Sequence, residues 1–102
     1  MVQIKNNQKR EGIESLVRAN QLDPNDVNCL VKLGEIFSRE ESKQDQAIKF
    51  LKKALSLNDV LPEAHLTLGR IYDKQQDDEL AIEHFKVAIK QSLNTQFQKV
   101  NM

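Results

Sequence analysis

One cysteine and two histidines in this 102-residue protein are the first candidates for catalysis or metal binding: Cys29, His65 and His84. A cysteine thiolate can act as a nucleophile, and an imidazole can transfer protons or bind a metal ion. Their spacing fits no zinc-ligand pattern, and the sequence has neither a glycine cluster able to hold phosphate nor a Gly-x-Ser-x-Gly motif. We therefore expect no catalytic residue, no metal site and no cofactor, and we predict that the protein is not an enzyme.

Cysteine usage, net charge and hydropathy argue against several classes of partner and cellular location. The lone Cys29 neighbours Leu30, so we expect a buried, unreactive thiol in a reducing, cytoplasmic environment. The formal net charge is zero, which argues against a nucleic-acid partner. The apolar runs are only a few residues long, which argues against a membrane span. A small-molecule substrate is not expected either.

Charge is balanced overall but clustered locally. Three lysines form a basic stripe on one predicted helix, and four carboxylates form an acidic stripe on another: Lys49, Lys52 and Lys53, and Asp77, Asp78, Glu79 and Glu83. One interpretation is that both stripes lie on a solvated outer face. The other is that one of them binds an oppositely charged partner.

An internal repeat of 34 to 35 residues organises the chain. Ala47, Leu51 and Ala54 recur 34 positions later as Ala81, Phe85 and Ala88, and Gly34 recurs 35 positions later as Gly69. A partial copy upstream places Gly12, Leu16 and Ala19 35 positions before the first set. The additional residue of the first full copy lies between positions 38 and 46, where a turn can absorb it.

Within each copy the apolar residues follow the i, i+3/i+4 spacing of helices. Sustained two-residue alternation, which would indicate strands, does not occur in the sequence. The polar breaks between apolar segments predict helices near residues 9–22, 26–40, 44–57, 62–75 and 78–92. Pro62 suits the first turn of its helix, since the N–H that proline lacks is not needed there.

The repeat resembles the tetratricopeptide repeat family. That family places Leu-Gly and then an aromatic residue in its first helix, and Ala, a large residue and Ala in its second helix. The matching residues here are Gly34, Phe37, Ala47, Leu51 and Ala54 in one copy, and Gly69, Tyr72, Ala81, Phe85 and Ala88 in the next. Leu30 and His65 stand where the family usually has Trp, so His65 is expected to pack partly buried, and Asp59 and Leu93 replace the closing proline. His84 is expected to face solvent or an edge between helices.

The resemblance implies an all-α fold in which antiparallel helix pairs stack into a right-handed α-solenoid of about two and a half repeats. We expect a single domain over residues 1–102, with a partial repeat at 1–26 and full repeats at 27–61 and 62–95. Residues 96–102 are expected to be a tail or the start of a further helix. Counting back from Gly12 places Met1 midway through a first helix, which indicates a piece of a longer array or a chain completed by a partner.

The resemblance also implies a non-catalytic module that binds a peptide or protein segment in a concave groove lined by the first helices. The inward positions of the family correspond here to Asn28, Val31, Glu35, Ser38, Glu63, Leu66, Arg70 and Asp73. Glu35 and Arg70 are the expected polar contacts, unless they pair with each other or are merely exposed. Some members of the family bind the C-terminal carboxylate of chaperones through Lys, Asn and Arg side chains on the first helices. Most of these positions hold other residues here, so a chaperone C-terminus is not the expected ligand.

Three other functions stay open. The chain could be a structural segment of a larger assembly that acts through end-to-end stacking or self-association of its terminal helices. It could be the targeting array of an enzyme whose catalytic part lies elsewhere. RNA binding of the pentatricopeptide type is disfavoured by the 34-residue pitch and the neutral charge.

Overall fold

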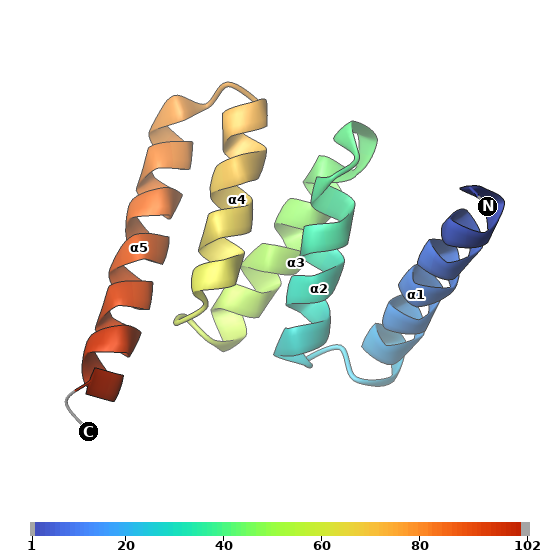
Figure 1. Cartoon of the computed structure of the whole chain (residues 1–102), viewed down its shortest axis with the longest axis horizontal. Coiled ribbons are helices and arrows are strands. Elements are labelled where there is room, and N and C mark those ends of the chain that lie inside the picture. The colour runs from blue at the N-terminus through green and yellow to red at the C-terminus, as the bar shows by residue number, and fades with distance from the viewer. Residues whose placement is uncertain (1, 101–102) are drawn as a thin grey trace.

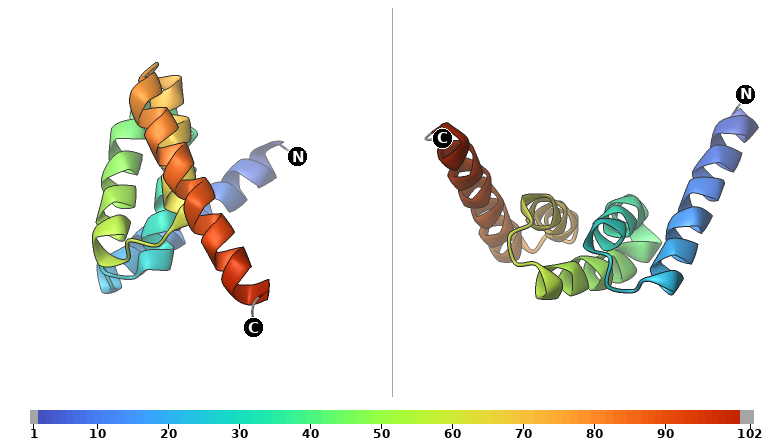
Figure 2. Two further views of the ribbon diagram at one scale, coloured as in Figure 1. Left: turned by 90° about the vertical axis from the view of Figure 1, so that its left-hand side faces the viewer. Right: turned by 90° about the horizontal axis from the view of Figure 1, so that it is seen from below.

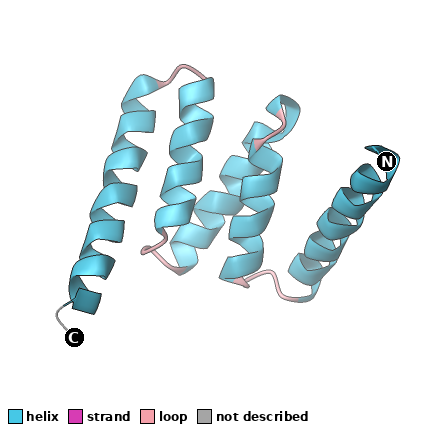
Figure 3. Ribbon diagram, in the orientation of Figure 1, coloured by secondary structure: helices cyan, strands magenta, loops and turns pink. Residues whose placement is uncertain are grey.

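The computed structural model describes the backbone of residues 2–100 and the side chains of residues 9–94. Five α-helices follow one another along the chain (Figures 1 and 3): α1 (Val2–Leu22), α2 (Val27–Ser38), α3 (Gln44–Leu57), α4 (Pro62–Lys74) and α5 (Asp78–Val100). A short 3₁₀ helix, η1 (Glu41–Lys43), connects α2 to α3. The fold is all-α over the described backbone, as the sequence predicts.

Two antiparallel helix pairs, α2 with α3 and α4 with α5, stack side by side, and α1 lies against α2 (Figure 1). Seen from below in Figure 2, the chain has the outline of a U. Helix α3 forms the base and α1 and α5 form the arms, so α2 and α4 lie on the inside. The first helix of each full repeat therefore lines the concave side of the molecule.

Large apolar side chains fill the space between the helices of each pair and between the two pairs. Those with almost no exposed surface are Leu30, Leu33, Leu51, Leu68 and Ile71. The small residues of the second helices, Ala47, Ala54 and Ala81, are buried as well. The equivalent residues of α1, Gly12 and Ala19, are exposed, because no described helix covers that face.

The helix ends follow from local chemistry. The Asp26 carboxylate accepts a hydrogen bond from the backbone N–H of Cys29 at 3.3 Å, which caps the first turn of α2. Asp77 caps α5 in the same way through the N–H of Leu80, also at 3.3 Å. Pro62 occupies the first turn of α4, as predicted.

Two helix boundaries differ from the prediction. Helix α1 is continuous from Val2 to Leu22 instead of beginning near residue 9. Helix α5 continues to Val100 instead of ending near residue 92, so residues 96–100 extend it and start no new helix. Both extensions lack Gly and Pro, and therefore contain no residue that would end a helix. Residues 1, 101 and 102 lie outside the described part of the chain.

Candidate protein-binding groove

A hollow of about 320 Å³ lies between α2 and α4, the two helices on the inside of the U. Five of the eight residues that the sequence predicts for a binding surface line this hollow: Glu35, Ser38, Glu63, Leu66 and Arg70. Four more lining residues were not predicted: Arg39, Thr67, Ile71 and Lys74. We call this hollow the inner groove.

The unpredicted residues divide into floor and rim. Ile71 is 1% exposed, and the buried Thr67 hydroxyl donates a hydrogen bond to the Glu63 carbonyl at 2.8 Å, so these two side chains form the floor. Arg39 and Lys74 are exposed on the rim. They follow Glu35 and Arg70 by four residues, one helical turn along the same face, and this spacing could have identified them from the sequence.

The other three predicted residues, Asn28, Val31 and Asp73, do not line the inner groove. Val31 is half-buried against the core. Asn28 is exposed in the first turn of α2, whereas that helix contributes only its residues from Glu35 onward to the groove. Asp73 has the same repeat position as Ser38, which faces the following first helix, and no first helix follows α4 within residues 2–100.

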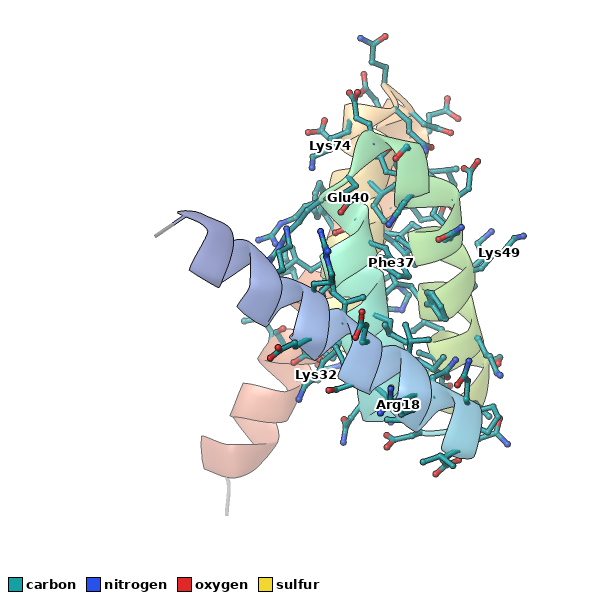
Figure 4. The ribbon with its side chains drawn as sticks, turned by 90° about the vertical axis from the view of Figure 1, so that its right-hand side faces the viewer. Arg18, Lys32, Phe37, Glu40, Lys49 and Lys74 are labelled. Atoms are coloured by element: carbon teal, nitrogen blue, oxygen red, sulfur yellow. The ribbon has the colours of Figure 1, made fainter. Side chains whose placement is uncertain are left out.

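Basic side chains gather at the rim without acidic partners. Among the side chains of residues 9–94, the ion pair within 4 Å is Lys43 with Glu40, at 3.5 Å. Glu35 and Arg70 therefore line the same groove without pairing with each other. Figure 4 shows Lys74 on the open side of the U, whereas Lys49 of α3 points away from the opposite, outer side.

A second hollow, of about 380 Å³, lies between α4 and α5, and we call it the apolar pocket. It is lined by Pro62, Glu63, Leu66, Ala88, Ile89, Ser92 and Leu93. Glu63 and Leu66 belong to both hollows, so the two join across α4. Leu93 was not predicted to lie at a binding surface, although its i, i+4 spacing from Ile89 puts the two side chains on one helix face.

The structure brings the two histidines together on the facing helices α4 and α5. The Nδ1 atoms of His65 and His84 lie 3.0 Å apart, and the rings stack with centroids separated by 5.3 Å. His84 also stacks on Tyr72 at 5.5 Å. Burial lowers the pKa of both imidazoles, and the neighbouring His84 lowers the pKa of His65 further. Both rings are half-buried, so His84 occupies an edge between helices.

Cys29 lies apart from the histidine pair, between α2 and α1 rather than between α4 and α5. Cys29 is buried, its thiol donates to the Leu16 carbonyl at 3.2 Å, and burial raises its pKa, with the Asp26 carboxylate as the next cause. The thiol thus joins α2 to α1. Within the described residues, no three His, Cys, Asp or Glu side chains lie together as a metal site. In the same part of the chain, no helix combines the length and apolar character that a membrane crossing requires.

Comparison with known proteins gives one family and one fold. The family model described as "Tetratricopeptide repeat" matches residues 27–60 and 62–95, which together exceed half of the chain. Among solved structures, "Crystal structure of MamA" aligns with a TM-score of 0.78 and 22% identity over 91% of this chain and 54% of that chain. "MamA MSR-1 C2" aligns with a TM-score of 0.75 and 23% identity, covering 90% and 52% respectively.

The present chain thus spans about half the length of either MamA chain. At these identities the likeness concerns the fold alone. No curated protein sequence matches the chain.

Proposed function

Because this chain belongs to the tetratricopeptide repeat family, we propose that it is a non-catalytic module that binds an extended segment of a partner protein in the inner groove. Members of this family are typically interaction modules. The proposal assigns the partner contacts to Glu35, Leu66 and Arg70, with Arg39 and Lys74 at the rim. The expected partner is a protein of the cytoplasm rather than a nucleic acid, a membrane or a small molecule.

One observation carries the proposal: five of the eight residues chosen by repeat position line one hollow on the concave side of the stacked helices. The groove combines an exposed apolar side chain, Leu66, with charged groups that have no ion-pair partner among residues 9–94. A binding surface needs both properties, since apolar area supplies affinity and charged groups select the partner. Stacked repeats use their concave surfaces for binding in this way.

Selection from an unbiased peptide library displayed on phage tests the proposal. Selected peptides are labelled and titrated by fluorescence anisotropy against the parent chain and a Glu35→Lys/Arg70→Glu variant. A matched control, Asp45→Lys/Lys49→Glu, exchanges two exposed charges on α3, outside the groove. Circular dichroism verifies that the three proteins are equally helical.

We expect saturable binding at one peptide per chain to the parent and the control, and loss of binding in the groove variant. Peptides that bind all three proteins equally would move the site to the helix ends or the outer face. A library without any binder would contradict the function itself.

A structural role is the second candidate, and the exposed apolar face of α5 favours it. Ile82, Ile89 and Leu93 are 52%, 60% and 58% exposed. Their spacing of seven and four residues puts them on one side of the helix. A stacked repeat or a second copy of the chain would bury this face.

Sedimentation velocity over a concentration series tests the structural role. Self-association predicts a sedimentation coefficient that rises with concentration in the parent and stays constant in Ile89→Asp. Ile89 is 60% exposed, so we expect this substitution to leave the fold intact, and circular dichroism checks it. A parent chain that stays monomeric over the whole series would contradict self-association.

A further inference from the structure

The inner groove and the apolar pocket differ in chemistry although they share Glu63 and Leu66. The pocket between α4 and α5 is walled by Leu66, Ile89 and Leu93. The far end of the groove, at the C-terminal ends of α2 and α4, carries Arg39 and Lys74. A segment crossing α4 at Leu66 would therefore meet an apolar site on one side and a basic site on the other.

The apolar pocket exposes three large aliphatic side chains to solvent. Leu66 is 38% exposed, Ile89 60% and Leu93 58%, and all three face the same hollow. Pro62, Ala88 and Ser92 line the rest of the hollow without charge, and Glu63, which the inner groove shares, adds one carboxylate. Covering these side chains with an apolar residue of a partner removes their surface from water, which is the main source of affinity at such a site.

The basic site is formed by three cations: Arg39 on α2, and Arg70 and Lys74 on α4. None of them has an ion-pair partner within 4 Å among residues 9–94. Their neighbour Ser38 already donates its hydroxyl to the Glu35 carbonyl at 2.6 Å, which leaves the cations as the free donors at this end. Guanidinium groups bind carboxylates in a bidentate geometry, so the chemistry of this end suits aspartate and glutamate.

The distance from the apolar pocket to the cations determines how many residues separate the apolar residue of the ligand from its carboxylates. Leu66 precedes Arg70 and Lys74 by four and eight residues of α4, or about 6 to 12 Å along a helix. An extended chain covers this distance in about two to four residues. Hollows of about 320 and 380 Å³ accommodate side chains.

We infer that the partner segment is extended and acidic, with one large apolar residue in the pocket between α4 and α5 and carboxylates at Arg39, Arg70 and Lys74, about two to four residues away. This inference rests on the proposed function and specifies its ligand. The inner groove is lined by three cations and two carboxylates, Glu35 and Glu63. Its net positive charge selects the acidic segment, and the shared Leu66 fixes the course of that segment across α4.

Synthetic peptides test the inference directly. Each fluorescein-labelled peptide contains one leucine and two aspartates in a Gly/Ser background, separated by zero to eight residues and made in both orders. Control peptides replace Asp by Lys, or Leu by Ser. Dissociation constants are measured by anisotropy with the parent chain, an Arg70→Gln/Lys74→Gln variant and a matched Lys49→Gln/Lys53→Gln variant, which removes two exposed lysines of α3.

We expect the tightest binding at a spacing of two to four residues, with weaker binding for both control peptides. The Arg70→Gln/Lys74→Gln variant should bind the acidic peptide about tenfold more weakly, because two ion pairs are lost. The Lys49→Gln/Lys53→Gln variant should bind it like the parent. Added salt should weaken binding in the parent more than in the groove variant.

Equal binding of the Asp and Lys peptides would overturn the inference, and so would tightest binding only at spacings longer than four residues. Equal losses of affinity in the Arg70→Gln/Lys74→Gln and Lys49→Gln/Lys53→Gln variants would also overturn it. So would binding that does not saturate below about 1 mM peptide. The library selection separates these failures from failure of the proposed function. Library peptides that need the groove but show no acidic preference would overturn only the inference. A library without groove binders would overturn both.

Discussion

Gly34 and Gly69 determine how closely the two helices of each pair approach. A Cβ atom added to Gly34 would lie 2.5 Å from Cγ of Leu51, and one added to Gly69 would lie 2.7 Å from the Phe85 ring. Both distances are too short for carbon atoms in contact. A large residue of the second helix thus packs directly on the backbone of the first. Gly12 differs, because an added Cβ would meet no atom within 4 Å.

Substitution of these glycines by alanine separates packing from helix propensity. Gly34→Ala should lower the free energy of unfolding by about 1–3 kcal/mol, because the fully buried Leu51 cannot move aside without strain. Gly12→Ala, the matched control, should raise it by about 0.5–1 kcal/mol through helix propensity alone. Urea unfolding followed by circular dichroism measures both values. A Gly34→Ala variant as stable as the parent would contradict this view of the helix pair.

The histidine pair makes stability depend on pH. The pKa values of His65 and His84 lie below the ordinary value of 6.5, chiefly because burial disfavours the charged imidazole. Glu83 on α5 opposes the shift at His84, and Lys52 on α3 adds to it. The unfolded chain therefore takes up protons at a higher pH than the folded chain. The stabilising contribution is complete above the unfolded pKa and is lost as the pH falls below it.

Urea unfolding at pH 7.5 and 5.5 measures this effect. The parent should be less stable at pH 5.5, and the difference should shrink in a His65→Gln/His84→Gln variant, which has no imidazole to protonate. If the parent and the variant lose the same stability between these pH values, other groups cause the loss.

At the scale of elements, the two repeats connect their first and second helices by different turns. In the first, η1 accommodates the additional residue between α2 and α3. In the second, the chain leaves α4 through Gln76, which has a φ of 62°. The N–H of Asp77 donates to the Tyr72 carbonyl at 2.9 Å, and the N–H of Gln76 donates to the Asp73 carbonyl at 3.0 Å. These two bonds form a Schellman motif, whose left-handed position favours glycine.

Gln76→Gly should raise the free energy of unfolding by about 0.5–1 kcal/mol, because glycine adopts the left-handed conformation without steric cost. The matched control is Gln75→Gly, one residue earlier, where φ is −82°. That substitution should lower the free energy of unfolding by a similar amount. Thermal unfolding of the three proteins checks the prediction, which would be wrong if Gln76→Gly melted below the parent.

At the scale of the whole molecule, each helix depends on its immediate neighbours. Helices α2, α3 and α4 have packed helices on more than one side, whereas α1 contacts only α2 among the described elements. Ile13 and Leu16 are the apolar side chains by which α1 packs on the core, together with the thiol bond from Cys29 to the Leu16 carbonyl. In repeat proteins stability is a sum of such neighbour contacts.

Hydrogen exchange should show that α1 is less stable than the helices with several neighbours. We expect the amides of residues 9–22 to exchange faster than those in α2, α3 and α4, because α1 can open without exposing the main core. Exchange followed by mass spectrometry of proteolytic fragments measures the difference. Uniform protection from α1 to α4 would show that the chain opens as a single unit.

The sequence by itself determined the repeat and the helix pairs, and it identified five of the nine residues that line the inner groove. It could do so because a 3.6-residue period records which face of a helix is buried, and a 34-residue recurrence records which helices are equivalent. The sequence also predicted the placement of Cys29 in the core. These properties depend on residues that are close together in the chain or repeated along it.

Only the tertiary structure decided which side chains meet across helices. His65 and His84 belong to different helices, and Leu66 joins α2-facing and α5-facing hollows. The cations Arg39, Arg70 and Lys74 line one hollow because α2 and α4 lie side by side. Such contacts depend on helix separation and crossing angle, which neighbouring residues in the sequence do not encode. The length of α1 and α5 was likewise open, since no Gly or Pro within the added turns ends either helix.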